Sequence, residues 1–173
     1  MQMDNRISMI TRGALIAALY AALVFVFAPI SFGAVQFRVA EALTLLPFLW
    51  LEAVPGLFVG CLVANMFGGL GPWDVFLGSG ATLLAAWLSY MSPNVVLAAL
   101  APVIVNGVIV GSYLTLIVGL PTPLIFSVAY VAAGEAMACF ALGIPLIRLL
   151  ERSGFMRGNG KVTERFHKNG EIQ

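Results

Sequence analysis

Charged residues are scarce in this sequence. Asp, Glu, Lys and Arg together make up 10% of the 173 residues, whereas soluble domains contain about 25%. Hydrophobic residues make up 61%, and the mean hydropathy is +0.99. This composition excludes an ordinary soluble domain and leaves no stretch that could form one beside the apolar segments. We therefore predict an integral membrane protein with about six short spans.

Several chemical motifs are also absent. The chain has no GxxxxGK[ST] phosphate loop, so it is not expected to bind ATP in the P-loop manner. It has no HExxH or CxxC pattern, and its one histidine, His167, lies in a polar tail. Its cysteines, Cys61 and Cys139, are isolated within apolar runs and are predicted to pack as small apolar residues. We therefore expect no enzyme activity, no cofactor, no metal site and no nucleic-acid partner.

The apolar runs are separated by Gly, Pro and polar clusters such as "PISFGA", "GGLGP", "MSPN" and "GLPTP". They predict an all-α fold of six transmembrane helices, at residues 9–30, 37–51, 54–69, 74–91, 95–118 and 123–149. The second and third runs are shorter than a ~30 Å hydrocarbon core requires. Residues 1–151 would then form a membrane domain, and residues 152–173 a polar tail with the composition of a disordered segment.

Basic residues are concentrated at the two ends of the chain. Eight of the nine Lys and Arg residues lie before residue 13 or after residue 147, and the exception is Arg38. The positive-inside rule places such segments in the cytoplasm. We therefore expect a multi-pass protein of the cell membrane with both termini cytoplasmic, which requires an even number of spans.

A few polar residues interrupt the predicted spans. A charged side chain at the centre of a spanning helix costs roughly 2.5–3.5 kcal/mol, so such residues are functional candidates. With both termini inside, the candidates come from five helices but share the outer half of the membrane. Polar groups at one depth can close around one solute, and an aromatic ring there can stack on it. The predicted substrate-binding residues are Arg38, Glu41, Asn65, Trp73, Asp74, Asn106, Tyr113 and Glu135.

Most of these residues also have a purely structural interpretation. Arg38 and Glu41 are spaced i, i+3 and could form an ion pair within one helix. Asp74 follows "GLGPW" and could cap the helix that it starts. Asn65 and Asn106 could join neighbouring helices by hydrogen bonds. A structural role and a ligand role can coexist at each of these positions.

Glu135 is the hardest of the polar residues to explain structurally. It has no basic residue within a helical turn in "VAAGEAMACF". A lone buried carboxylate must be protonated or meet a cation or hydrogen-bond donors, so a ligand role is favoured. Trp73, in contrast, could be an anchor at the membrane interface. Glu52 lies at a predicted cytoplasmic turn and is interpreted as an interfacial charge.

The first predicted helix carries two rows of small residues at a spacing of four. One row is Ala14, Ala18 and Ala22, and the other is Gly13, Ala17 and Ala21. Small residues let another helix approach closely. That helix could belong to this chain or to a separate membrane subunit, and composition does not choose between them. The candidate docking residues are Ala14, Ala17, Ala18, Ala21 and Ala22.

Four segments carry a resemblance to a known family: "APISFGAVQFRVAEALTLLPF", "GCLVANMFGGLGPWDVFLGSGATLLAA", "VNGVIVG" and "VAYVAAGE". They resemble the QueT family, whose members are substrate-binding S components of energy-coupling factor (ECF) transporters. The resemblance implies a six-helix S-component fold and a queuosine precursor such as preQ1 or preQ0. It also implies a transmembrane coupling protein and two cytoplasmic ATPases, which would use the ATP. In many members an acidic residue stands where this chain has Tyr113.

A 7-deazaguanine of this kind suits the predicted polar residues. Its N1–H and 2-amino groups lie side by side, so that one carboxylate can accept both. Three other functions remain as alternatives. They are an S component for riboflavin or thiamin, an intramembrane enzyme that uses Glu41 and Glu135 as an acid–base pair, and an ion-coupled carrier.

Overall fold

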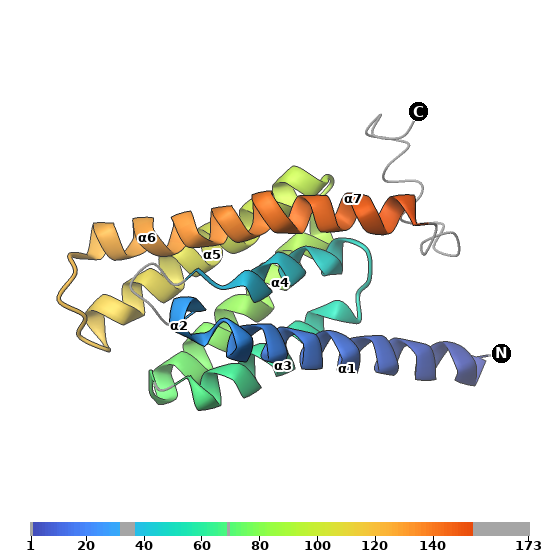
Figure 1. Ribbon diagram of the computed structural model, residues 1–173, viewed down its shortest axis with the longest axis horizontal. Coiled ribbons are helices and arrows are strands. Elements are labelled where there is room, and N and C mark those ends of the chain that lie inside the picture. Colours follow the sequence, from blue (N-terminus) through green and yellow to red (C-terminus); the bar gives the residue numbers. More distant parts are fainter. Residues whose placement is uncertain (1, 32–36, 69, 154–173) are drawn as a thin grey trace.

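The computed structural model describes residues 2–31, 37–68 and 70–153, with side chains from residue 6 onward. Every regular element in these ranges is helical (Figure 1). The predicted polar tail lies outside the described residues from residue 154 onward. In chain order the elements are α1 (Gln2–Val26), α2 (Ala28–Ser31), η1 (Val39–Phe48), α3 (Ala53–Phe67), η2 (Asp74–Gly78), α4 (Ser79–Met91), α5 (Val95–Leu116), α6 (Leu124–Ala136), η3 (Met137–Gly143) and α7 (Ile144–Arg152).

Residues typical of turns and caps lie at the helix boundaries that the sequence predicted. Asn94 caps α5, because its side-chain oxygen accepts a hydrogen bond of 2.8 Å from the backbone N–H of Leu97. Gly71 and Gly119 lie in the connections after α3 and α5 and have φ values of 88° and 79°. This left-handed backbone conformation favours glycine. The "GGLGP", "MSPN" and "GLPTP" segments are therefore confirmed as helix boundaries.

The all-α prediction is confirmed for the described residues, since each of the six predicted apolar segments contains helix. Within the residues that the structure describes, three helices are long and apolar enough to cross a membrane: Arg6–Val26, Val95–Leu116 and Leu124–Arg152, the last made of α6, η3 and α7. The start of α1 and the end of α7 lie at the same end of the bundle (Figure 1). This arrangement is compatible with an even number of crossings, but six spans and cytoplasmic termini stay predictions.

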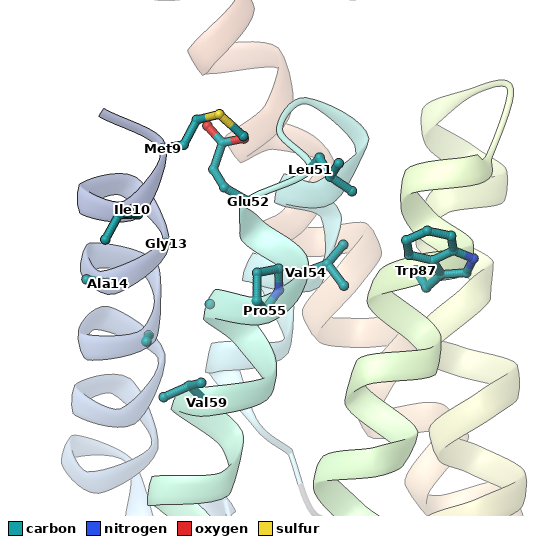
Figure 2. Close-up of a pocket in the computed structure, with 12 residues that line it drawn as sticks. Met9, Ile10, Gly13, Ala14, Leu51, Glu52, Val54, Pro55, Val59 and Trp87 are labelled. Carbon is teal, nitrogen blue, oxygen red and sulfur yellow. The ribbon is translucent and has the colours of Figure 1, made fainter. Parts of the chain in front are cut away.

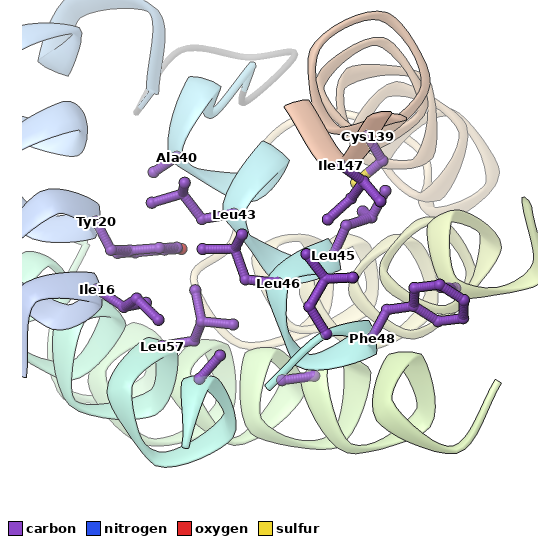
Figure 3. Close-up of a cluster of buried hydrophobic side chains, with 14 of the residues drawn as sticks. Ile16, Tyr20, Ala40, Leu43, Leu45, Leu46, Phe48, Leu57, Cys139 and Ile147 are labelled. Carbon is purple, nitrogen blue, oxygen red and sulfur yellow. The ribbon is translucent and has the colours of Figure 1, made fainter. Parts of the chain in front are cut away.

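Element η1 is a buried core segment, and nine of its ten residues are buried. It is a 3-10 helix, which at about 2.0 Å per residue rises about 20 Å, short of the ~30 Å hydrocarbon core. Pro47 lies inside it and lacks the N–H that an α-helix would use there. Leu43 and Leu46 share one apolar cluster with Tyr20 of α1 and Leu57 of α3 (Figure 3). The segment that carries Glu41 is thus surrounded by the rest of the chain.

Helix α1 packs closely on α3 through small residues on both helices. A Cβ added to Gly56 would lie 2.5 Å from the carbonyl oxygen of Gly13, and one added to Gly60 would lie 2.7 Å from that of Ala17. Ala21 is also buried. The structure therefore gives the Gly13, Ala17 and Ala21 row an internal packing role. The other row is exposed along its whole length, at Ala14, Ala18 and Ala22.

Candidate functional site

Eight polar side chains of the described residues are buried between α1, η1, α3, η2, α5 and α6. Each is 5% exposed or less, although together they include four charged groups. Seven of them were predicted from the sequence, and Tyr20 was not. The cluster, called the polar cluster below, consists of Tyr20, Arg38, Glu41, Asn65, Asp74, Asn106, Tyr113 and Glu135.

One half of the polar cluster joins two carboxylates through one amide. Asn106 Nδ2 donates to Glu135 Oε1 at 2.9 Å and also lies 3.5 Å from Glu41 Oε2. The other oxygen of Glu41, Oε1, accepts a hydrogen bond from the hydroxyl of Tyr20. This chain of contacts connects α1, η1, α5 and α6. The two glutamates, 94 residues apart in the sequence numbering, therefore belong to one site.

The other half is built around Asp74, the first residue of η2. Its Oδ1 accepts hydrogen bonds from Arg38 Nη2 at 3.5 Å and from the Tyr113 hydroxyl. Its backbone oxygen accepts from Asn65 Nδ2 at 2.9 Å. A Cβ on Gly78 would lie 2.8 Å from Asp74 Oδ1 and 3.0 Å from Asn65 Nδ2. The absence of a side chain at Gly78 therefore makes room for these polar groups.

Four buried oxygens of the polar cluster have no hydrogen-bond partner, and all four are acceptors. They are Asn65 Oδ1, Asp74 Oδ2, Asn106 Oδ1 and Glu135 Oε2. The amide nitrogens of both asparagines donate to protein oxygens, which fixes the orientation of each amide. Leaving a buried acceptor unsatisfied costs about 1–3 kcal/mol, and native structures contain few of them. A ligand rich in hydrogen-bond donors would satisfy all four.

The charges of the polar cluster favour the same kind of ligand. The cluster contains three acidic residues and one basic residue, namely Glu41, Asp74, Glu135 and Arg38. Its formal charge is therefore −2 if all four are ionised. Arg38 forms an ion pair of 3.5 Å with Asp74. Buried charges are costly unless they are paired and hydrogen-bonded. A donor-rich or cationic ligand would therefore bind here more readily than an anionic one.

Two π-helical turns lie next to the polar cluster. Asp74 opens η2, and Glu135 lies two residues before η3 begins at Met137. π turns are rare and frequently mark functional sites, because the wider turn changes the direction of the side chains around it. Their position supports a functional role for both acidic residues.

The structure corrects two of the structural interpretations. Arg38 precedes η1 in an extended conformation, with φ −94° and ψ 102°, so it does not share a helix face with Glu41. Its guanidinium lies against Asp74, which is 36 residues away in sequence. Asp74 does not cap a helix, because its side-chain hydrogen bonds go to Arg38 and Tyr113 and its Oδ2 has no partner. Both residues hold different elements together.

Two other residues have side chains outside the polar cluster. Trp73 directly precedes the buried Asp74, but its side chain is 52% exposed, as the interpretation of an interfacial anchor expects. Glu52, interpreted as an interfacial charge, forms an ion pair of 3.1 Å with Arg12 of α1. Arg12 also lies over the ring of Trp50, 5.8 Å from its centroid. These contacts join the turn before α3 to α1.

Tyr20 is the residue that the sequence analysis missed. It lies in an apolar helix, α1, whose sequence pattern indicates only rows of small residues. A tyrosine in the middle of such a run is itself a signal, because a buried phenol usually finds a hydrogen-bond partner. The sequence does not indicate that this partner is Glu41. Cys61 and Cys139 are free and buried, as predicted, and within the described ranges no group of three or more His, Cys, Asp or Glu residues could hold a metal ion.

A second feature is an apolar groove of about 610 Å³ between α1, the start of α3 and α4 (Figure 2). None of the residues around it belongs to the polar cluster. Ala14, at the start of the exposed row, lies on its α1 side. The groove is lined by Met9, Ile10, Gly13, Ala14, Ala17, Leu51, Glu52, Val54, Pro55, Gly56, Val59 and Trp87.

Comparison with known proteins supplies the family. No curated protein and no solved structure matches the chain. The sequence model of the QueT transporter family matches residues 10–152. This range includes the whole polar cluster and the helices from the middle of α1 to the end of α7. The chain is therefore a transport protein, with apolar helices suited to a membrane, and it belongs to the QueT transporter family.

Proposed function

We propose that this chain is the substrate-binding S component of an ECF-type importer and captures a 7-deazaguanine queuosine precursor at the polar cluster. The observation that carries the proposal is the set of four buried acceptors without donors, at Asn65, Asp74, Asn106 and Glu135. Such a set fits a compact ligand whose rim carries N–H groups. Membership in the QueT transporter family supports the same class of solute.

The chemistry of a 7-deazaguanine complements these atoms. Its N1–H, 2-amino and N9–H groups are donors, and the aminomethyl group of preQ1 adds an ammonium. Glu135 Oε2 and Asn106 Oδ1 would accept from one donor edge of the ligand. The ligand oxygen O6 needs a donor, which the guanidinium of Arg38 would supply. A cationic substituent would reduce the excess negative charge of the site.

We further propose that transport requires partners, namely a transmembrane coupling protein and two cytoplasmic ATPases. The exposed Ala14, Ala18 and Ala22 row would let a helix of the coupling protein approach α1 closely. The neighbouring groove would extend that contact surface. In this arrangement the chain spans the cell membrane with both termini in the cytoplasm, and the ATPases supply the energy.

One experiment tests the substrate directly. The chain is purified from cells grown with queuosine precursors, its bound small molecule is extracted, and the molecule is identified by mass spectrometry. Recovery of an unchanged 7-deazaguanine supports the proposal. Riboflavin or thiamin would instead identify an S component for another vitamin, and a chemically altered product would indicate an enzyme. Uptake that persists in cells without the ATPases would indicate an ion-coupled carrier.

A further inference from the structure

Tyr20 is a fully buried phenol on α1, on the face that points into the bundle. Its neighbours on this face, Ile16 and Val24, are buried apolar residues. Its hydroxyl donates a hydrogen bond to Glu41 Oε1. Close packing holds the residue in place, because a Cβ on Gly60 of α3 would lie 2.9 Å from the Cβ of Tyr20. The backbones of two helices therefore determine where this hydroxyl lies.

The two oxygens of Glu41 are contacted by residues of two different helices, α1 and α5. Oε1 accepts from Tyr20, and Oε2 faces Asn106 Nδ2 at 3.5 Å. The same Nδ2 donates to Glu135 Oε1 at 2.9 Å. The oxygens left at this end without a donor are Asn106 Oδ1 and Glu135 Oε2. The contacts thus run from Tyr20 through Glu41 to Asn106 and Glu135. Their positions determine which oxygens of the last two residues are open to a ligand.

We propose that Tyr20 is a positioning residue of the substrate site, whose hydroxyl fixes the carboxylate of Glu41 and through it the amide of Asn106. The inference rests on the proposed function, since it takes the polar cluster as the place where the solute binds. Phenylalanine keeps the ring in its apolar surroundings and removes this one donor. Glu41 Oε1 then has no partner, so the carboxylate turns away from Asn106, and the amide keeps only its hydrogen bond to Glu135 Oε1.

The test is a double-mutant cycle on the full chain in lipid nanodiscs, with 7-aminomethyl-7-deazaguanine as the probe in calorimetric titrations. Tyr20→Phe is expected to bind about tenfold more weakly, equal to about 1.4 kcal/mol. Glu41→Ala is expected to lose at least as much. The double variant should bind no more weakly than Glu41→Ala, because without the carboxylate the hydroxyl has nothing to position. Tyr130→Phe, on the 44% exposed tyrosine of α6, is the matched control and should bind as wild type does.

Three other results of the cycle would each contradict a part of the proposal. Equal losses from Tyr20→Phe in the wild-type and Glu41→Ala backgrounds would mean that the phenol acts independently of Glu41, which overturns its positioning role. If Glu41→Ala weakens binding but Tyr20→Phe binds as tightly as wild type or more tightly, the positioning role of Tyr20 is overturned and the proposed substrate site is not. If Glu41→Ala binds as tightly as wild type, the proposed substrate site is wrong, and the role of Tyr20 with it.

Thermal unfolding of each variant separates binding from folding. If Tyr20→Phe alone does not fold, the comparison of Glu41→Ala with the double variant remains available, because neither contains the carboxylate that needs the hydroxyl. Equal affinities of these two proteins support the inference. A further tenfold loss in the double variant overturns it.

Discussion

Gly60 of α3 lies directly against Ala17 of α1, so close that a Cβ on Gly60 would be 2.7 Å from the Ala17 carbonyl oxygen. The two helices can pack at this distance only because neither presents a large side chain there. One of the two small-residue rows of α1 is thereby used within the chain. The other row, at Ala14, Ala18 and Ala22, is exposed, and it is the row that we propose for docking.

Gly60→Leu should prevent normal packing of α1 on α3, because a bulky side chain would meet the α1 backbone. Overpacking typically costs about 1–3 kcal/mol and occasionally more, and here the obstacle is backbone that cannot rotate away. We expect a clear fall in thermal unfolding temperature or in the yield of folded protein. The measurement is thermal denaturation in detergent, with Ala18→Leu on the exposed row as the variant that should unfold as wild type does.

Ala18→Leu should abolish uptake in cells that contain the coupling protein and ATPases, while the purified chain still binds its solute. The leucine would stand on the outer face of α1, where it disturbs no internal contact but separates α1 from a docked helix. Uptake of labelled 7-aminomethyl-7-deazaguanine and titration of the purified protein measure the two properties. Ala133→Leu, on an exposed position of α6, is the matched control. Normal uptake by Ala18→Leu would assign docking to another surface.

Glu135→Gln should weaken solute binding at least tenfold, which corresponds to about 1.4 kcal/mol. The amide keeps one acceptor but turns the other oxygen into a donor that faces a donor of the ligand, and a lost charge-assisted hydrogen bond costs about 1.5–3 kcal/mol. The measurement is a binding titration on purified protein. The affinities of wild type and variant should differ less for a base that lacks the 2-amino group.

Glu52→Gln is the control for that substitution, because Glu52 lies on the groove and pairs with Arg12 outside the polar cluster. Its affinity for the solute should equal that of wild type. If Glu135→Gln also binds as tightly as wild type, the carboxylate of Glu135 is structural, and recognition of the base edge must be assigned to Glu41 or Asp74.

Gly78→Ala should weaken binding about tenfold through crowding of Asp74 and Asn65, since the added Cβ would lie 2.8 Å and 3.0 Å from their polar atoms. Gly80 is two residues away and has open space where a Cβ would be, so Gly80→Ala is a matched control. It should bind normally and gain up to about 1 kcal/mol of stability from helix propensity. Titration and thermal unfolding of both variants distinguish the results. Equal affinities of the two would show that the space at Gly78 is not needed for the site.

The sequence by itself determined the class of the protein, the helical segments and most members of the polar cluster. Composition and the length of apolar runs are local properties, and they decide whether a segment suits a membrane. The cost of a buried charge is equally local, so Arg38, Glu41, Asp74 and Glu135 could be recognised as functional candidates without any knowledge of their partners.

Tertiary structure alone decided how these residues pair. Arg38 contacts Asp74 rather than sharing a helix face with Glu41, and Tyr20 joins the cluster from a long apolar run of α1. Such contacts link segments tens of residues apart and depend on how the helices pack. The same packing separates the two rows of α1, because only the position of α3 determines that Ala17 is partly covered and Ala18 is exposed.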